Sequence, residues 1–136
     1  MNAPLRPLDD YSLADRYARR RGRVFLTGTQ ALVRVALDQA RRDREAGLNT
    51  GGLISGYRGS PLGGLDLELW RVREMLKEGR IEFLPAVNED LAATAILGSQ
   101  QVETEPGAQV QGTFGLWYGK GPGGLTWLSW PGSCPR

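Results

Sequence analysis

The feature that most constrains the fold is an alternation of short apolar runs with longer segments of helical period. Residues 52–56 form an apolar run bounded by glycines, which predicts a buried strand, and residues 81–86 and 109–116 predict two more. Residues 65–78 and 89–101 lie between these runs and carry helical patterns. Strands separated by helices usually join in parallel. We therefore expect an α/β fold, with a partial parallel sheet and helices on its faces.

A further helix is predicted before the first strand, and its ends carry clear signals. Thr27 and Gln30 have the spacing of a capping box, and Gly47 suits the position after the last turn. Residues 23–26 are expected to lead into this helix or to form a short strand. The apolar residues expected on one face of the helix are Ala31, Leu32, Val35, Ala36 and Ala40.

The two later helices have stop, stripe and cap signals of their own. Gly79 is expected to end the helix over residues 65–78, and Asn88 is a favourable N-cap for the helix over residues 89–101. The stripe predicted to pack into the core is Leu65, Leu69, Val72 and Leu76.

Composition excludes several classes of protein. A chain of 136 residues suits one domain, and its formal net charge of +2 is too small for general nucleic-acid steering. It has no histidine and a single cysteine, Cys134, which excludes a histidine-based triad, the common zinc sites and an intrachain disulfide. We expect no metal site within the chain. No apolar run is long enough for a membrane span, so a cytoplasmic location is the default expectation.

The loop after the first strand is one candidate site, because ligands of parallel sheets bind at the carboxyl ends of strands. Its glycines would let backbone amides approach a ligand, with a serine hydroxyl as a further donor. The alternative is an ordinary glycine-rich connection. The candidate residues of this loop are Tyr57, Arg58, Gly59, Ser60 and Pro61.

Glu89 is the second candidate, and it also has two interpretations. With Asp90 it lies in the first turn of a predicted helix, where acidic residues favourably meet the helix dipole. Alternatively, Glu89 is a carboxylate presented at a strand end. Apolar neighbours would then raise its pKa and allow it to hydrogen-bond a ring nitrogen.

Other motifs are weaker. Residues 119–124 match a dinucleotide-binding glycine pattern, but Pro122 follows where a helix should begin, so we discount it. Trp70, Phe83, Trp117 and Tyr118 are expected in the core or at an interface. A cluster of arginines favours a solvated arm or a contact with another domain over nucleic-acid binding. Its members are Arg16, Arg19, Arg20, Arg21 and Arg23.

Several blocks of the sequence, taken together and in order, carry a resemblance. They are residues 25–34, 47–50, 54–66, 87–95, 98–101 and 114–123. Over residues 11–123 the chain resembles the opening part of the long, fused bacterial indolepyruvate ferredoxin oxidoreductases, members of the 2-oxoacid:ferredoxin oxidoreductase superfamily. Residues 1–22 are then a polar lead-in arm, residues 23–123 an incomplete domain, and residues 124–136 a tail unlike the family.

The resemblance implies a fold, a cofactor and a role for each candidate. Residues 23–123 would resemble the domain that holds the pyrimidine ring of thiamine diphosphate. Glu89 would hydrogen-bond N1′ of that ring and favour its imino tautomer, which helps to activate the cofactor. Tyr57, Arg58, Gly59, Ser60 and Pro61 would face cofactor and substrate, with Ser60 the main side chain.

The parent enzyme implied by the resemblance oxidatively decarboxylates an aryl 2-oxoacid and passes electrons to ferredoxin. Magnesium and iron–sulfur clusters would be bound outside this chain, which we expect to be an amino-terminal fragment, inactive without the missing domains or a partner chain. Two alternatives remain. One is a small binding subunit that completes a site with a partner. The other is a nucleic-acid-associated basic protein, although we expect neither nucleic acid nor membrane as a partner.

Overall fold

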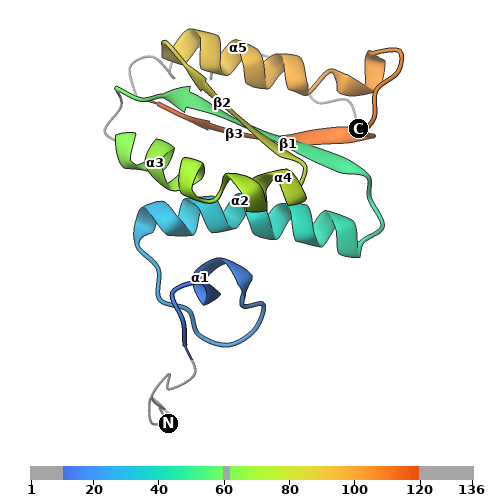
Figure 1. Ribbon diagram of the computed structural model, residues 1–136. Coiled ribbons are helices and arrows are strands. Elements are labelled where there is room, and N and C mark those ends of the chain that lie inside the picture. Colours follow the sequence, from blue (N-terminus) through green and yellow to red (C-terminus); the bar gives the residue numbers. More distant parts are fainter. Residues whose placement is uncertain (1–10, 60–61, 120–136) are drawn as a thin grey trace, which may run out of the picture.

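The computed structural model describes residues 11–59 and 62–119, and their centre is one parallel sheet of three strands (Figure 1). The strands are β1 (Thr50–Tyr57), β2 (Ile81–Ala86) and β3 (Gly112–Tyr118). Their order is β2-β1-β3, and β1 pairs in parallel with both neighbours. The predicted α/β class with a small parallel sheet is therefore confirmed. The predicted tail, residues 124–136, lies outside the described residues.

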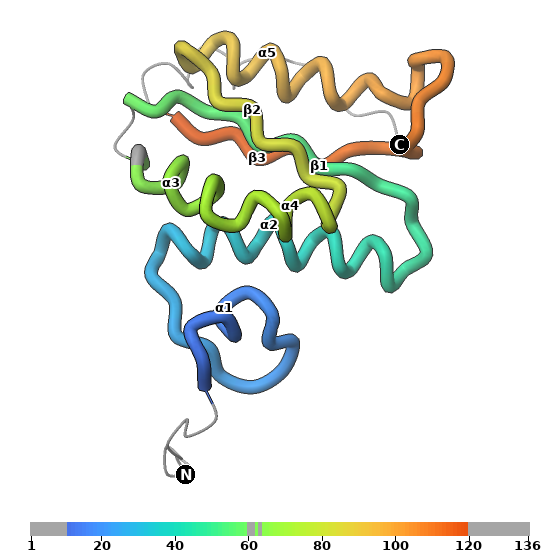
Figure 2. The backbone as a smooth tube through the Cα atoms, in the orientation of Figure 1, coloured from blue at the N-terminus to red at the C-terminus, as the bar shows by residue number. Residues whose placement is uncertain are grey.

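The helices form layers on the two faces of the sheet. One face is covered by α5 (Glu89–Ser99), and the other by α2 (Gly28–Glu45), α3 (Gly63–Arg71) and α4 (Arg73–Glu78), as Figures 1 and 2 show. The short α1 (Asp15–Ala18) lies beyond α2, and a 3-10 turn, η1 (Val102–Thr104), follows α5. Residues 23–27 lead into α2 and form no strand.

Both predicted ends of α2 are confirmed. The Thr27 hydroxyl accepts a hydrogen bond from the Gln30 N–H at 3.3 Å, and the Gln30 side chain accepts from the Thr27 N–H at 3.1 Å. Gly47 has a φ of +76°, the left-handed conformation that ends helices and favours glycine.

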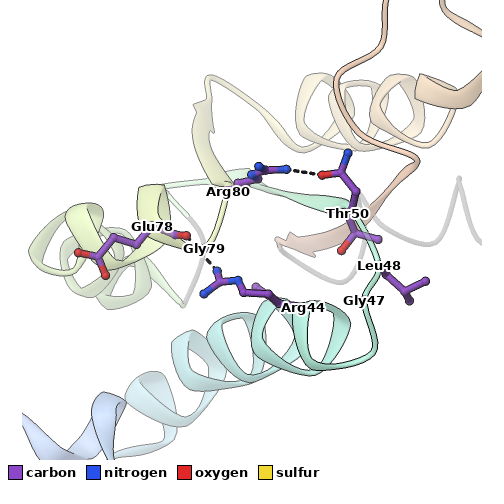
Figure 3. Close-up of a pocket in the computed structure, with 9 residues that line it drawn as sticks. Arg44, Gly47, Leu48, Thr50, Glu78, Gly79 and Arg80 are labelled. Carbon is purple, nitrogen blue, oxygen red and sulfur yellow. Dashed lines mark hydrogen bonds between the residues drawn. The ribbon is translucent and has the colours of Figure 1, made fainter.

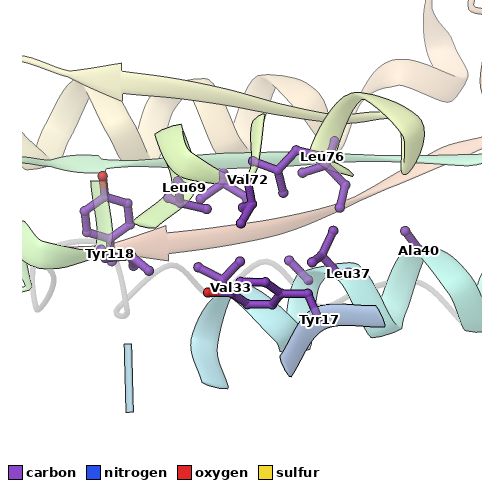
Figure 4. Close-up of a cluster of buried hydrophobic side chains, with 12 residues drawn as sticks. Tyr17, Val33, Leu37, Ala40, Leu69, Val72, Leu76 and Tyr118 are labelled. Carbon is purple, nitrogen blue, oxygen red and sulfur yellow. The ribbon is translucent and has the colours of Figure 1, made fainter. Parts of the chain in front are cut away.

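The predicted buried face of α2 is partly wrong. Leu32 and Val35 are exposed, whereas Val33 and Leu37 are buried with Ala36 and Ala40. Residues 31–37 are apolar over most of the helix circumference, so local periodicity does not choose a face. Tertiary packing decides it, because α2 packs against α3 and β1, and Tyr17 of the amino-terminal arm lies beside Val33 and Leu37 (Figure 4).

The helix predicted over residues 65–78 is kinked. The Val72 N–H is shared between the carbonyl oxygens of Glu68, at 3.3 Å, and Leu69, at 3.2 Å, which separates α3 from α4. The stripe continues through the kink and is buried as predicted, and Gly79 ends α4. β2 has its predicted bounds, and β1 is longer than predicted. β3 begins and ends later in the sequence than predicted, and α5 ends at Ser99, before the predicted residue 101.

The hydrophobic core lies almost wholly on the face covered by α2, α3 and α4 (Figure 4). Ile54 of the central strand is fully buried there. On the opposite face, α5 buries only Ala92 and leaves Leu91 and Leu97 about half exposed. The two layers therefore differ strongly in how much apolar surface anchors them.

Residues 11–22 dock on the domain. Tyr17 is 5% exposed, and its hydroxyl donates to Glu68 Oε1 at 2.5 Å. Arg34 of α2 donates to the carbonyl oxygens of Arg16 and Arg19, both at 2.5 Å. Within the arginine cluster, Arg20 pairs with Glu45 at 3.0 Å. The arm is thus held by one buried side chain and by its own backbone.

Replacing Tyr17 by phenylalanine should lower the free energy of unfolding by about 1–3 kcal/mol, because a buried carboxylate loses its donor. Burial alone would raise the pKa of Glu68, but hydrogen bonds from Tyr17 and Arg71, with the Arg71 and Arg16 charges, hold it below its ordinary value. The stabilisation from ionised Glu68 is fully present above the pKa that Glu68 has in the unfolded chain. It is lost as the pH falls through the lower pKa of the folded state. Tyr17→Phe should therefore also weaken the acid dependence of stability.

Urea unfolding at pH 7 and at a pH near 3.5 measures both effects. Tyr11→Phe is the matched control, because the Tyr11 hydroxyl makes an exposed hydrogen bond to the Phe25 carbonyl at 3.1 Å. It should change stability by no more than about 0.5 kcal/mol. Equal effects of the two substitutions would contradict the role given to Tyr17.

Candidate functional site

The carboxyl ends of the three parallel strands lie side by side at one end of the strands, which we call the carboxyl edge of the sheet. Tyr57, the last residue of β1, pairs with Ala86 of β2, and Gly56 pairs with Tyr118 of β3. The segments that follow these strands therefore begin side by side. Both sequence-predicted sites, the loop after β1 and the start of α5, follow strands at this edge.

Glu89 is the first residue of α5 and is half-buried. The predicted N-cap is confirmed, since Asn88 Oδ1 accepts from the Leu91 N–H at 2.8 Å. After β2 the chain passes across β1 and reaches β3, which lies on the other side of the central strand. Trp117 Nε1 of β3 donates a hydrogen bond to the Glu89 carbonyl oxygen there, at 3.3 Å. Glu89 is thereby held near the carboxyl end of β1 by contacts with β3.

Gly119 allows this approach. A Cβ atom at position 119 would lie 2.9 Å from Glu89 Cγ and 2.7 Å from Trp117 Cζ2, both closer than real contacts allow. The Glu89 side chain thus packs against bare backbone just after β3. The site so far is one carboxylate, one indole and one glycine.

Gly119→Ala should displace Trp117 or Glu89 and lower stability by about 1–3 kcal/mol. Chemical unfolding measures this cost, and the indole Nε1–H signal of Trp117 in an NMR spectrum should shift. An unchanged Trp117 signal together with unchanged stability would show that position 119 is not closed to a side chain.

The loop after β1 is described in part. The Tyr57 ring lies against Gly59, where an added Cβ would meet ring atom Cε1 at 2.5 Å. Arg58 and Gly59 are exposed. Ser60 and Pro61 lie outside the described residues. The structure therefore brings the start of this loop to the same sheet edge as Glu89, while the closest neighbours of Glu89 come from β3.

Two neighbours of Glu89 were missed by sequence reasoning. The sequence predicts Trp117 in the core or at an interface, and Gly119 belongs to the glycine pattern that we discount. Their roles depend on α5 crossing the central strand and on the register of β3 against β1. Neither can be derived from local periodicity, so no signal in the sequence marks these residues as part of the site.

A buried pair anchors the end of β3 on the other face of the sheet. The Tyr118 hydroxyl donates to Asp66 Oδ1 of α3, and both residues are buried, at 4% and 2% exposure. Burial, together with the hydrogen bond and charge of Asp66, raises the pKa of Tyr118 above its ordinary value. Tyr118 therefore stays protonated at neutral pH and acts as a fixed donor. Adjacent residues of β3 thus hold α5 through Trp117 and α3 through Tyr118.

Asp66 was also missed as a structural anchor, because an acidic residue in the first turn of a helix is normally explained by the helix dipole.

Over residues 11–59 and 62–119, no group of three or more acidic, cysteine or histidine side chains is placed to hold a metal ion. In the same two segments, no helix combines the length and hydropathy that a bilayer span requires.

Comparisons of the chain with protein-family models, with curated proteins and with solved structures found no match.

Proposed function

We propose that this chain supplies the pyrimidine-binding part of a thiamine-diphosphate-dependent 2-oxoacid:ferredoxin oxidoreductase, with Glu89 as the residue that holds the aminopyrimidine ring. The observation that carries the proposal is the placement of Glu89. It is a half-buried carboxylate at the start of α5, held near the carboxyl end of the central strand by Trp117 and Gly119. In parallel sheets this edge is where ligands bind.

The described residues that support the proposal concern the pyrimidine end of the cofactor. A carboxylate next to glycine backbone leaves room for a flat nitrogen heterocycle to hydrogen-bond with it, and Glu89 Cγ packs against Gly119. The sequence resemblance implies that magnesium and the diphosphate would be held by other domains. Thiamine diphosphate, when bound, supplies the carbanion chemistry of decarboxylation. The part of Glu89 is to orient the ring and to control the proton at N1′.

The sequence resemblance supports the rest of the proposal. The substrate would be an aryl 2-oxoacid such as indolepyruvate, and the electrons would pass to ferredoxin through iron–sulfur clusters outside this chain. Tyr57, Arg58, Gly59, Ser60 and Pro61 would line the cofactor and substrate side of the same edge. We propose a cytoplasmic enzyme in which this chain is inactive without those other domains.

Exposed apolar side chains near β2 support the need for further domains or a partner chain. Leu84 of this edge strand is 49% exposed, and Val87, just after it, is 77% exposed. On α3, Trp70 is 51% exposed and packs edge-on against Phe83 of β2, with ring centroids 5.3 Å apart. Exposed apolar side chains of this kind along an edge strand support a contact with another domain or chain.

The test uses the pyrimidine alone, 4-amino-5-hydroxymethyl-2-methylpyrimidine, added to the full chain and followed by NMR. We expect weak binding, in the millimolar range typical of a fragment with few contacts, because a ring of this size has few atoms to bind with. Amide signals of Glu89 and Gly119 and the Trp117 indole signal should shift. Glu89→Gln should abolish these shifts, and the chain alone should reduce no ferredoxin. Absence of any shift at this edge, or unchanged shifts in Glu89→Gln, would refute the proposal.

A further inference from the structure

A pocket lies at the opposite end of the strands from Glu89, where β1 and β2 begin (Figure 3). It has a volume of about 420 Å³, which is within the range of small-molecule sites. The end of α2 with the turn after it, the first residue of β1, and the end of α4 with the turn before β2 form its walls. The residues that matter here are Arg44, Leu48, Asn49, Glu78 and Arg80.

Two guanidinium groups face this pocket, and each is held by a neutral acceptor. Arg44 Nη2 donates to the Glu78 carbonyl oxygen at 3.0 Å, and Arg80 Nη1 donates to Asn49 Oδ1. In the part of the chain that the structure describes, neither forms a salt bridge with a carboxylate. Other arginines of the domain do, and the pairs are Arg20–Glu45, Arg34–Asp38, Arg41–Asp38, Arg71–Glu68 and Arg73–Glu74.

Three carboxylates close in sequence to these arginines are engaged or directed elsewhere. Glu45 pairs with Arg20 at 3.0 Å. Both oxygens of Asp43 accept hydrogen bonds, one from Gln39 at 2.7 Å and one from the Thr50 hydroxyl at 2.6 Å. The Glu78 side chain extends away from the two guanidinium groups, as Figure 3 shows. Because each guanidinium has five N–H donors, most donors of both arginines remain for a ligand.

The backbone conformation of Arg80 also supports a role for its side chain. Arg80 has a φ of +54°, a conformation at the end of a helix that favours glycine and strains any other residue. Its N–H donates to the Lys77 carbonyl at 2.9 Å and its carbonyl accepts from the Gly52 N–H at 3.0 Å, so the neighbouring structure imposes this conformation. Backbone strain at a residue other than glycine is typical of functional sites, which points to a use for the Arg80 side chain.

We propose that this pocket binds the phosphoryl group of a small phosphorylated molecule between Arg44 and Arg80. Two guanidinium forks match the geometry and charge of a phosphate dianion. The pocket is larger than a free phosphate ion fills, and the half-exposed Leu48 gives it an apolar wall for an organic group. The site is independent of the proposed function, because it lies at the other end of the strands from Glu89.

The test titrates the full chain with inorganic phosphate, with phenyl phosphate and with succinate, and follows the arginine Nε–H signals by NMR. Both phosphate compounds should give saturable shifts at Arg44 and Arg80, with tighter binding of phenyl phosphate. Arg80→Gly keeps the backbone conformation and removes the guanidinium. It should weaken binding about ten-fold or more, as should Arg44→Gln. Arg42→Gln, a charge-matched change on the same helix outside the pocket, should leave binding unchanged.

The outcomes distinguish an organic phosphate from the free phosphate ion, and specific binding from attraction by charge alone. Binding of inorganic phosphate without phenyl phosphate would overturn the assignment to a phosphorylated molecule, because the pocket would then take only the free ion. Succinate binding as tightly as phosphate would overturn the proposal, since charge alone would explain it. It would also be overturned if neither phosphate compound saturates, or if Arg42→Gln weakens binding as much as Arg80→Gly. None of these outcomes depends on Glu89.

Discussion

Replacing Gly56 by alanine should lower the free energy of unfolding by about 3 kcal/mol or more, a large part of the stability of a domain this small. An added Cβ would lie 2.4 Å from the carbonyl oxygen of Tyr118 and 2.5 Å from its ring atom Cδ1. The carbonyl belongs to the paired strand β3 and cannot rotate away as a side chain can. Relief of the clash would require the carboxyl ends of β1 and β3 to separate.

Gly112→Ala is the matched control, because Gly112 also lies in a strand of this sheet but an added Cβ has no atom within 4 Å. It should change stability by no more than about 0.5 kcal/mol. Urea unfolding followed by circular dichroism compares the two variants. Similar stabilities would mean that the ends of β1 and β3 are not packed as closely as described here.

Glu89→Gln should lower turnover about 10²–10⁴-fold in an enzyme in which this domain is completed by diphosphate-binding and ferredoxin-reducing domains. Glutamine keeps the size of the side chain and a hydrogen bond, but it cannot control the proton at the ring nitrogen. The measurement is 2-oxoacid-dependent ferredoxin reduction, with the folded state of the variant checked by its unfolding curve.

The control for this prediction is Asp90→Asn, which removes the next carboxylate in the same first helical turn. Both substitutions should cost about 0.3–1 kcal/mol through the helix dipole. Only Glu89→Gln should also reduce turnover strongly. Equal turnover in the two variants would reduce Glu89 to a residue that completes the start of α5.

Much of the fold was predictable because its signals are local. The capping box at Thr27, the N-cap at Asn88 and the stripe from Leu65 to Leu76 each depend on residues within one or two turns, and all are confirmed. The buried face of α2 was not predictable in the same way. Its sequence is apolar on several sides, and packing against α3, β1 and Tyr17 selects the face.

The candidate site was predictable only as far as strand ends determine it. Glu89 and Tyr57 could be assigned to one edge because parallel strands end together. The contacts of Glu89 with Trp117 and Gly119 join residues about 30 positions apart and depend on how α5 crosses the sheet. The left-handed conformation of Arg80 could not be read from the sequence either, because glycine occupies the position before it.

The unequal anchoring of the two layers has a consequence for the order in which the domain opens. α5 carries Glu89 but buries little beyond Ala92, so its local unfolding should require less free energy than global unfolding. Amide hydrogen exchange should then be faster in α5 than in α2 or β1. A ligand or partner seated against Glu89 would slow that exchange by stabilising the closed state, with no rearrangement of the core.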